Sequence, residues 1–401
     1  IYFKMKKLIA LFLLISMPAA NAAPDSFNFT GKGFGHGVGL SQIGARSMAM
    51  NGASAIDILT HYFPGTEILA VPDNQILRVN IGHKQKTIRL TIASKTGSIQ
   101  IFNKKSEDLN ESPLTPLTLS DKKGAITFTT VGNRVSVSVI NSGIASSLPL
   151  AKEMTIKWNP ETVVKVSPGG VTYQFGQMQI KSVKSLLELT NSVSLHNEYL
   201  YGVSEMPSSW SPAALEAQII TARTYASRKA NNIRVECDCD LFGSTKDLNF
   251  VGNQKISEPK WGGQWKAAVD ATAIDGENGY VISYMGMPIS AFFFSSSAGI
   301  TDSSKNAFGS ASPYLVSVPD PGSQDAKLNP RFYKWERSVS QEKIAKAFGL
   351  SDVVAIQIIS RNATDSVAKV QGISNDGKKV ILKGETFRSR TGLPSTWFYL
   401  I

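Results

Sequence analysis

The chain has 401 residues, of which 42% are apolar and 18% charged, an ordinary composition for a globular protein with room for one to three domains. Its formal net charge of +11 favours anionic partners, but no helix-turn-helix pattern or aromatic-interleaved basic cluster indicates nucleic acid. Beyond the first 22 residues no apolar run approaches the length of a membrane span, which argues against a transmembrane protein.

The N-terminal residues have the pattern of a secretory signal. A basic stretch, Met5-Lys6-Lys7, is followed by an apolar run from Leu8 to Met17 and by small residues that predict cleavage after Ala22. We therefore predict a signal peptide at residues 1–22, of which residues 1–4 precede the start methionine as an upstream extension. The expected location is the cell envelope, the periplasm or the outside of the cell.

A glycine-rich segment follows the signal. Five glycines alternate with other residues in Gly33-Phe34-Gly35-His36-Gly37-Val38-Gly39-Leu40-Ser41-Gln42-Ile43-Gly44-Ala45, a pattern that lets the backbone approach a ligand closely. It lacks the Gly-Lys-Ser/Thr ending of a phosphate-binding loop. His36 could be a buried hydrogen bonder, a metal ligand or an acid/base group, and its glycine neighbours favour a presented side chain. Residues 45–59 then predict a helix interrupted near Gly52.

Residues 71–182 are predicted to form a β-rich region, because polar and apolar residues alternate between Gly, Asn, Asp and Ser turns. This region has few candidate catalytic or binding residues. The expected strands are residues 76–81, 87–92, 98–102, 125–130, 134–139, 154–158 and 171–180.

Glu205 lies at a predicted break between two helices. Pro207 disfavours helical dihedrals at Met206, so the helix over residues 195–203 must end there, and a new helix starts at Ser211 with proline at its first position. Apolar neighbours, the negative end of the preceding helix dipole and partial burial would each disfavour the charged carboxylate. A glutamate at a helix end is more commonly a solvated cap, so this segment alone does not establish an acid.

The second helix, residues 212–229, has one apolar stripe, and Arg223 lies off it. Two roles are open for Arg223: an ion pair with a nearby carboxylate, which is the commoner role, or a contact with substrate. Later, an apolar strand delivers Ser295, Ser296 and Ser297 to a small-residue loop, where their hydroxyls bind a ligand, orient Glu205 or satisfy their own backbone. The absence of a Gly-x-Ser-x-Gly pattern argues against a serine nucleophile.

The two cysteines, Cys237 and Cys239, are separated by one residue. In an oxidising compartment they favour a structural disulfide or a free pair over a zinc site, because no histidine lies at zinc-finger spacing. Further helices are expected at residues 262–272 and 340–348, with a hairpin over 279–289 between them.

Several of these segments together resemble the family of stage II sporulation protein D and the amidase enhancer (SpoIID/LytB). The resemblance covers most of the mature chain, in a permuted arrangement with the Gly-His-Gly motif first. Its motifs are the glycine-rich segment, Glu198-Tyr199-Leu200-Tyr201-Gly202-Val203, Glu205-Met206-Pro207, Ala214-Leu215-Glu216-Ala217-Gln218, Ala222-Arg223-Thr224-Tyr225-Ala226, Phe294-Ser295-Ser296-Ser297-Ala298-Gly299 and Phe387-Arg388.

The resemblance implies an α+β fold, with the β-rich region and with helices that form a cleft around the Glu-Met-Pro segment. Residues 23–70 would carry the Gly-His-Gly motif and residues 183–401 the catalytic core. The implied activity is that of a lytic transglycosylase on peptidoglycan glycan strands, some family members acting on strands stripped of stem peptides. Such an enzyme needs one carboxyl group, here Glu205, and no metal or cofactor.

For such an enzyme we hypothesise that the sugar is bound by His36, Ser41, Gln42, Arg223, Ser295, Ser296 and Ser297. The alternative is a non-catalytic wall-binding protein that enhances an N-acetylmuramoyl-L-alanine amidase, which would then be its partner. A two-carboxylate hydrolase that pairs Glu205 with Glu198 or Glu216 is a third reading.

Overall fold

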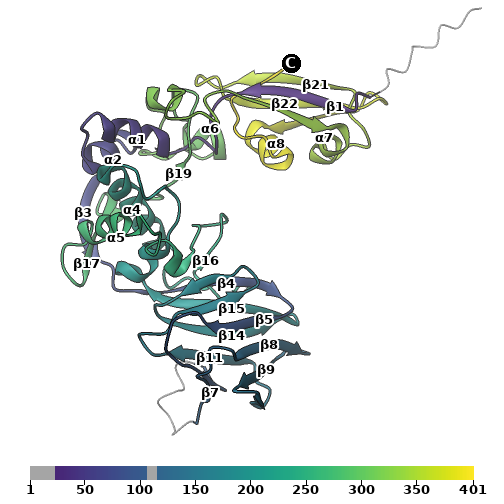
Figure 1. Ribbon diagram of the computed structural model, residues 1–401. Coiled ribbons are helices and arrows are strands. Elements are labelled where there is room, and N and C mark those ends of the chain that lie inside the picture. The colour runs from purple at the N-terminus through teal and green to yellow at the C-terminus, as the bar shows by residue number, and fades with distance from the viewer. Residues whose placement is uncertain (1–22, 106–114) are drawn as a thin grey trace, which may run out of the picture. The chain divides into compact units, whose positions relative to one another are not determined.

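The computed structural model describes residues 23–105 and 115–401, so the predicted signal peptide lies outside the described residues. The chain divides into two compact units, one of residues 32–334 and one of residues 23–31 with 335–401 (Figure 1). This division differs from the predicted segments 23–70, 71–182 and 183–401, because the first strand pairs with strands near the C-terminus. No helix in the described part of the chain is long and apolar enough to cross a membrane.

Two packed sheets form the β-rich part of the larger unit (Figure 1). One has the order β10-β9-β8-β5-β12-β13 and the other β16-β4-β15-β14-β11-β6-β7, antiparallel except for the β16–β4 pair. Their strands are β4 (Ile76–Gln85), β5 (Ile88–Ile92), β6 (Ile99–Phe102), β7 (Leu117–Leu119), β8 (Ala125–Val131), β9 (Arg134–Asn141), β10 (Ile144–Ser147), β11 (Glu153–Trp158), β12 (Val164–Ser167), β13 (Val171–Tyr173), β14 (Gln177–Val183), β15 (Leu186–Ser194) and β16 (Leu241–Phe242).

One strand prediction in this part was wrong, and β7, β10, β12, β15 and β16 were not predicted. Residues 171–180 form two strands instead of one, because Gly176 adopts a positive φ of 74° between β13 and β14. Strand β15 was missed altogether. Its sequence does alternate, with apolar Leu187, Leu189 and Val193 between polar residues, but seven of its nine residues are buried, so both faces of the strand are covered.

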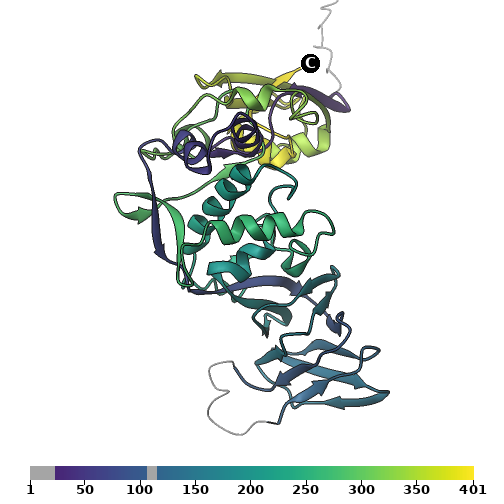
Figure 2. The same ribbon diagram turned by 60° about the vertical axis from the view of Figure 1, so that its left-hand side comes forward.

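Helices make up most of the rest of the larger unit. Helix α4 lies at its centre and packs against α1, α2 and α5 (Figure 2). Eleven of its sixteen residues are buried, so burial includes the predicted apolar stripe and extends beyond it to polar residues such as Gln218 and Arg223. The helical segments are α1 (Gln42–Met50), α2 (Ala55–Tyr62), the π-turn η2 (Leu195–Tyr199), α3 (Leu200–Gly202), α4 (Pro212–Ser227), the short η3 (Gly252–Gln254), α5 (Gly262–Ala271), α6 (Ser304–Phe308) and η4 (Pro321–Gln324).

Two small sheets join distant parts of this unit. Strand β17 (Asn278–Tyr284) pairs with β3 (Glu67–Pro72) and with β18 (Met287–Pro288). Strand β19 (Phe293–Phe294) lies parallel to β2 (Leu40–Ser41). This second pairing brings the glycine-rich segment beside the serine-rich loop, although more than 250 positions separate them in the chain.

The smaller unit contains two three-stranded sheets and two helices. The order is β20-β1-β24 in one sheet and β21-β22-β23 in the other. Ser340 caps α7 and Gly349 ends it in the left-handed conformation, which confirms the helix predicted there. The elements are β1 (Ser26–Gly31), β20 (Trp335–Ser340), α7 (Gln341–Phe348), β21 (Ala355–Arg361), β22 (Val367–Ile373), β23 (Lys379–Lys383), α8 (Gly384–Thr391) and β24 (Phe398–Leu400).

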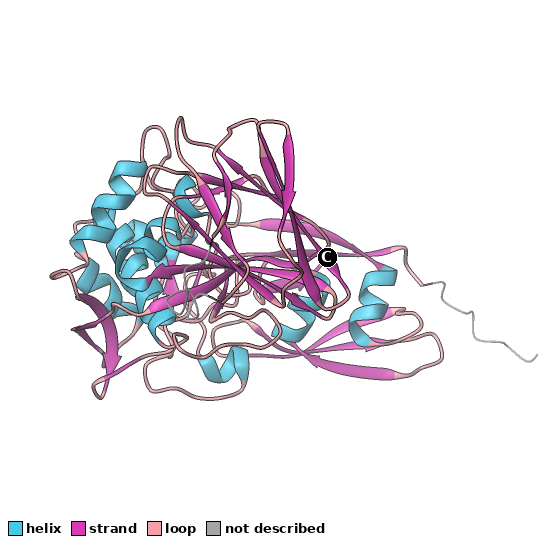
Figure 3. Cartoon of the chain, turned by 90° about the horizontal axis from the view of Figure 1, so that it is seen from below, coloured by secondary structure: helices cyan, strands magenta, loops and turns pink. Residues whose placement is uncertain are grey.

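The fold class is mixed α+β, as predicted. Antiparallel sheets and groups of helices follow one another along the chain, and residues 23–105 and 115–401 contain no repeated β-α-β crossover (Figure 3).

Candidate active site around Glu205

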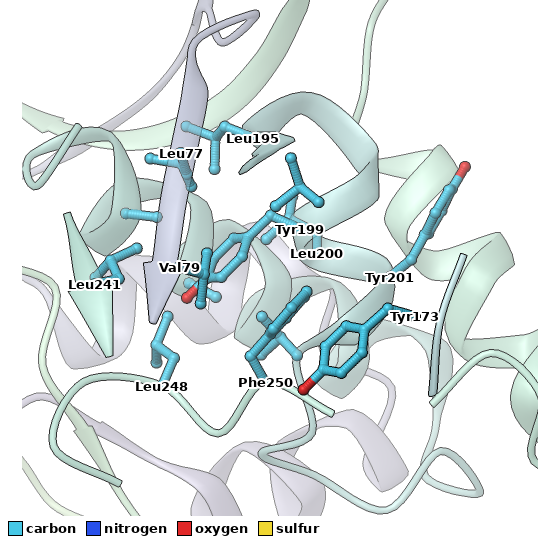
Figure 4. Close-up of a cluster of buried hydrophobic side chains, with 14 of the residues drawn as sticks. Leu77, Val79, Tyr173, Leu195, Tyr199, Leu200, Tyr201, Leu241, Leu248 and Phe250 are labelled. Atoms are coloured by element: carbon cyan, nitrogen blue, oxygen red, sulfur yellow. The ribbon is translucent and has the colours of Figure 1, made fainter. Parts of the chain in front are cut away.

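Glu205 lies at the predicted break. The π-turn η2 and α3 end at Gly202, Val203 is already extended, and α4 begins at Pro212 behind the extended residue Ser211. Below the break, Tyr199 packs among apolar side chains of the β4 strand and the loop before η3 (Figure 4). The break therefore rests on a buried hydrophobic cluster, which limits its freedom to move.

The backbone of the break is bound by side chains from three distant segments. Gln42 Nε2 donates to the Glu205 carbonyl at 3.0 Å, across 163 positions of sequence. Lys255 Nζ donates to the Met206 carbonyl at 2.7 Å, and Asn249 Nδ2 donates to the carbonyl just before Glu205 at 3.1 Å. These carbonyl groups lie in the loop between α3 and α4, where no helix supplies a partner, so the three donors satisfy them and hold the glutamate backbone in place.

Glu205 is half-buried, and its Oε1 accepts the Asn249 backbone N–H at 2.6 Å. Burial raises the pKa of Glu205, and the hydrogen bond from Asn249 lowers it by less, so the net direction is upward. This is the direction expected from the sequence. A carboxyl with a raised pKa keeps its proton closer to neutral pH, as a general acid must.

Glu205 and His36 line the same pocket, which has a volume of about 350 Å³. His36 Nδ1 accepts the Val38 N–H at 3.1 Å, so the neutral ring carries its proton on Nε2. The other polar residues of the lining are Tyr225, Thr245, Lys246 and Asp247, and the apolar ones are Ala291, Phe292, Phe293 and Phe308. A pocket with aromatic walls and a few polar groups suits a polar organic ligand such as a sugar.

A second carboxyl group, Asp247, lies in this pocket, and sequence reasoning gave it no role. It accepts hydrogen bonds from the Tyr225 hydroxyl at 2.7 Å, from Arg234 Nη2 at 2.9 Å and from the Phe242 N–H at 2.8 Å. Burial would raise the pKa of Asp247, but these donors outweigh it and lower that pKa. The pocket thus holds one carboxyl that tends to keep its proton and one that tends to stay charged.

Cys237 and Cys239 form a disulfide, the first of the two arrangements predicted. The backbone of Arg234 exchanges hydrogen bonds with Cys239, so the disulfide turn holds the arginine that binds Asp247. In residues 23–105 and 115–401, no group of three or more His, Cys, Asp or Glu side chains is placed to hold a metal ion.

Arg223 is fully buried and does not line the pocket. Its Nε lies 2.8 Å from Asp73 Oδ2, and its Nη1 donates to the Thr272 hydroxyl at 2.9 Å. Asp73 also binds His196 Nδ1 at 2.6 Å. Burial lowers the pKa of Arg223 to about 10, so it remains a cation at neutral pH. The structure places it in the structural ion pair that was its commoner predicted role.

Ser41 and Ser297 are also buried, in a network centred on Asp320. Asp320 accepts hydrogen bonds from Tyr62 at 2.8 Å, Ser297 at 2.7 Å and Ser323 at 2.6 Å. Ser41 Oγ contacts Ser323 Oγ at 3.0 Å. These hydroxyls tie the glycine-rich segment to the serine-rich loop and are not accessible to a ligand.

The other two serines act through their backbones. Ser296 is buried and exchanges hydrogen bonds with Phe34, and the half-buried Ser295 accepts the Ile43 N–H at 2.9 Å. Of the residues predicted to bind substrate, the structure brings His36 and Gln42 to Glu205. The serines and Arg223 lie outside the pocket lining, and their hydrogen bonds and ion pair join the segments that surround it.

We predict that Gly44→Ala destabilises the larger unit by about 1–3 kcal/mol. An added Cβ would overlap Tyr62 Oη and Asp320 Oδ1, so the buried network would have to open. The measurement is urea unfolding, with Gly263→Ala in helix α5 as the control, because no atom lies within 4 Å of a Cβ there. That control should gain up to about 1 kcal/mol. Equal stability of the two variants would contradict the prediction.

Comparison with known proteins places this region in a family. Residues 184–284 match the family described as Stage II sporulation protein. This range contains Glu205, Arg223 and Asp247, whereas His36, Gln42 and the serine-rich loop lie outside it. No solved structure matches the chain.

Curated relatives agree with this match. Stage II sporulation protein D of Bacillus subtilis is 27% identical over 255 residues, which are 59% of this chain and 70% of that protein. The protein of the same name from Bacillus amyloliquefaciens is 33% identical over 211 residues, 50% of this chain and 58% of the relative. The amidase enhancer of Bacillus subtilis is 28% identical over 173 residues, 43% of this chain but only 21% of the enhancer. These matches show that the chain is similar to stage II sporulation protein D and to the amidase enhancer, the SpoIID/LytB family that its motifs resemble.

Proposed function

We propose that this protein is an exported lytic transglycosylase that cleaves peptidoglycan glycan strands, with Glu205 as its catalytic residue. The observation that carries the proposal is the Glu205 carboxyl itself. It lines a pocket, its pKa is raised by burial, and its backbone is held by Gln42 and Lys255. The family's association with the cell wall supports the choice of substrate.

In the proposed reaction, protonated Glu205 gives its proton to the glycosidic oxygen as the bond to N-acetylmuramic acid breaks. The resulting carboxylate then takes the proton from the C6 hydroxyl of the same sugar, whose oxygen bonds to the anomeric carbon and closes the anhydro ring. The glutamate returns to its acid form, so no water is consumed. His36 and the aromatic walls of the pocket would bind the sugar and support the positively charged transition state.

A hydrolase would need a second carboxylate to activate water or attack carbon. Neither Glu198 nor Glu216 lines the pocket, and Glu198 accepts the Ser194 N–H in the preceding turn. Asp247 does line it, but both of its oxygens already accept hydrogen bonds from Arg234. That engagement favours the single-carboxyl mechanism over the two-carboxylate one.

The second candidate function is a glycan-binding enhancer of a cell-wall amidase. The similarity to a protein named amidase enhancer favours it. Such a protein would hold a glycan in the same pocket without cleaving it, and its partner would be the amidase.

The test is mass spectrometry of the soluble products after the protein acts on intact glycan strands and on strands stripped by an amidase. The lytic mechanism predicts anhydro-ended fragments. Fragments with reducing ends would point to the hydrolase instead. No products from either substrate, together with retained sedimentation on the strands, would favour the enhancer.

A further inference from the structure

A second pocket adjoins the Glu205 pocket. This second pocket has a volume of about 210 Å³ and shares Tyr225 and Phe292 with the first. It lies where helix α4 ends, and its other lining residues are Arg228, Lys229, Asn232 and Ser290. The two pockets are therefore neighbours, close enough for adjoining parts of one polymer to reach both.

The second pocket carries two positive charges and, in the part of the chain that the structure describes, no Asp or Glu in its lining. Neither Arg228 nor Lys229 forms an ion pair with a described residue. Such cations at a helix end commonly just offset the helix dipole. Here, however, Arg228 Nη1 donates to the Pro288 carbonyl at 2.7 Å, and Lys229 Nζ lies 5.5 Å from the centre of the Tyr225 ring. Both charged groups are held at the pocket by these contacts.

We propose that Arg228 and Lys229, with Asn232, form a carboxylate-binding subsite that adjoins the Glu205 pocket. The inference rests on the proposed glycan substrate. It adds that the protein recognises a carboxylate group on that glycan. A guanidinium group with one nitrogen committed to Pro288 still has further N–H donors for a carboxylate, and the ammonium of Lys229 adds a second charge. Two sources could supply the carboxylate: the lactyl group of a muramic acid without peptide, or a stem peptide.

The experiment measures binding calorimetrically in a Glu205→Gln background, which prevents turnover. The probes are three tetrasaccharides of alternating N-acetylglucosamine and N-acetylmuramic acid: with free lactyl carboxylates, with the same groups as methylamides, and with stem peptides that carry free carboxylates. The subsite predicts that a carboxylate probe binds about 10- to 100-fold tighter than the methylamide probe. The tighter of the two carboxylate probes identifies the source.

In the same background, Arg228→Gln with Lys229→Gln should bring this affinity ratio close to one. The matched control is Arg89→Gln with Lys165→Gln, which removes two exposed positive charges from the β-rich part of the same unit. It should leave the ratio unchanged. Equal affinity for all three probes, a ratio that survives the Arg228 and Lys229 substitutions, or an equal loss in the control would each overturn the subsite.

The two proposals fail differently in this design. If no probe binds, the subsite is overturned together with glycan recognition. If the probes bind with the expected ratio but the wild-type protein releases no anhydro fragments, the lytic function is overturned and the carboxylate subsite stands.

Discussion

Replacing Glu205 with glutamine is expected to lower the rate of anhydro-product release from glycan strands by about a thousandfold or more. The glutamine side chain has nearly the same shape, and its carbonyl oxygen can still accept the Asn249 N–H. It cannot donate a proton to the leaving oxygen or take one from the C6 hydroxyl. Mass spectrometry of products, with sedimentation on the same strands, measures turnover and binding separately.

The control for this substitution is Glu216→Gln. Burial raises the pKa of Glu216 as well, but it lies on helix α4 outside the pocket lining. That variant should retain turnover. Anhydro products released by Glu205→Gln at the wild-type rate would remove Glu205 from the mechanism.

The same substitution should leave the protein at least as stable at neutral pH. Because the pKa of Glu205 is raised in the folded state, its contribution to stability is present below the ordinary glutamate pKa and is lost as the pH rises through the folded value. Urea unfolding at pH 7 should therefore show Glu205→Gln equal to or above the wild type, with the difference smaller at acidic pH. A clear loss of stability at neutral pH would indicate a structural role instead.

The substitution Asp73→Asn is expected to have the largest effect on stability, a loss of about 3–5 kcal/mol in the free energy of unfolding. Asp73 and Arg223 are both fully shielded from solvent, and the aspartate also binds His196. A neutral amide would leave the Arg223 charge buried without a counter-ion. Urea unfolding of the whole chain, followed by the fluorescence of tryptophans such as the buried Trp265, measures the loss.

The matched control is Asp270→Asn in the ion pair with Lys266. That pair has a shorter N–O distance of 2.7 Å, but each side chain is 48% exposed. Water therefore solvates both charges, and the expected loss is at most about 1 kcal/mol. Similar losses in the two variants would mean that burial does not set the strength of the Asp73–Arg223 pair.

The features that were predictable from the sequence are those with local causes. Pro207 and Pro212 restrict backbone dihedrals by steric contact with their immediate neighbours, so the break at Glu205 follows from a few adjacent residues. The α7 helix was predictable for the same reason, because a serine caps its first turn and a glycine ends it. The alternation of polar and apolar residues found most of the half-exposed strands for the same reason.

Contacts between distant segments decided the rest. Helix α4 has no exposed face to mark its orientation, so no periodicity could show that Arg223 turns inward to Asp73. The Asp247 carboxyl reaches the pocket because the loop after the disulfide folds against Tyr225 and Arg234.

By itself the sequence determined the α+β class, the break that carries Glu205 and the motifs that resemble the SpoIID/LytB family. Only the tertiary structure decided which residues surround that glutamate. Gln42 meets the Glu205 carbonyl across 163 positions, and the strand pairing of β2 with β19 brings the glycine-rich segment to the serine-rich loop. Burial, ion pairing and raised or lowered pKa values depend on such neighbours, because each is set by the groups that exclude or replace water around a side chain.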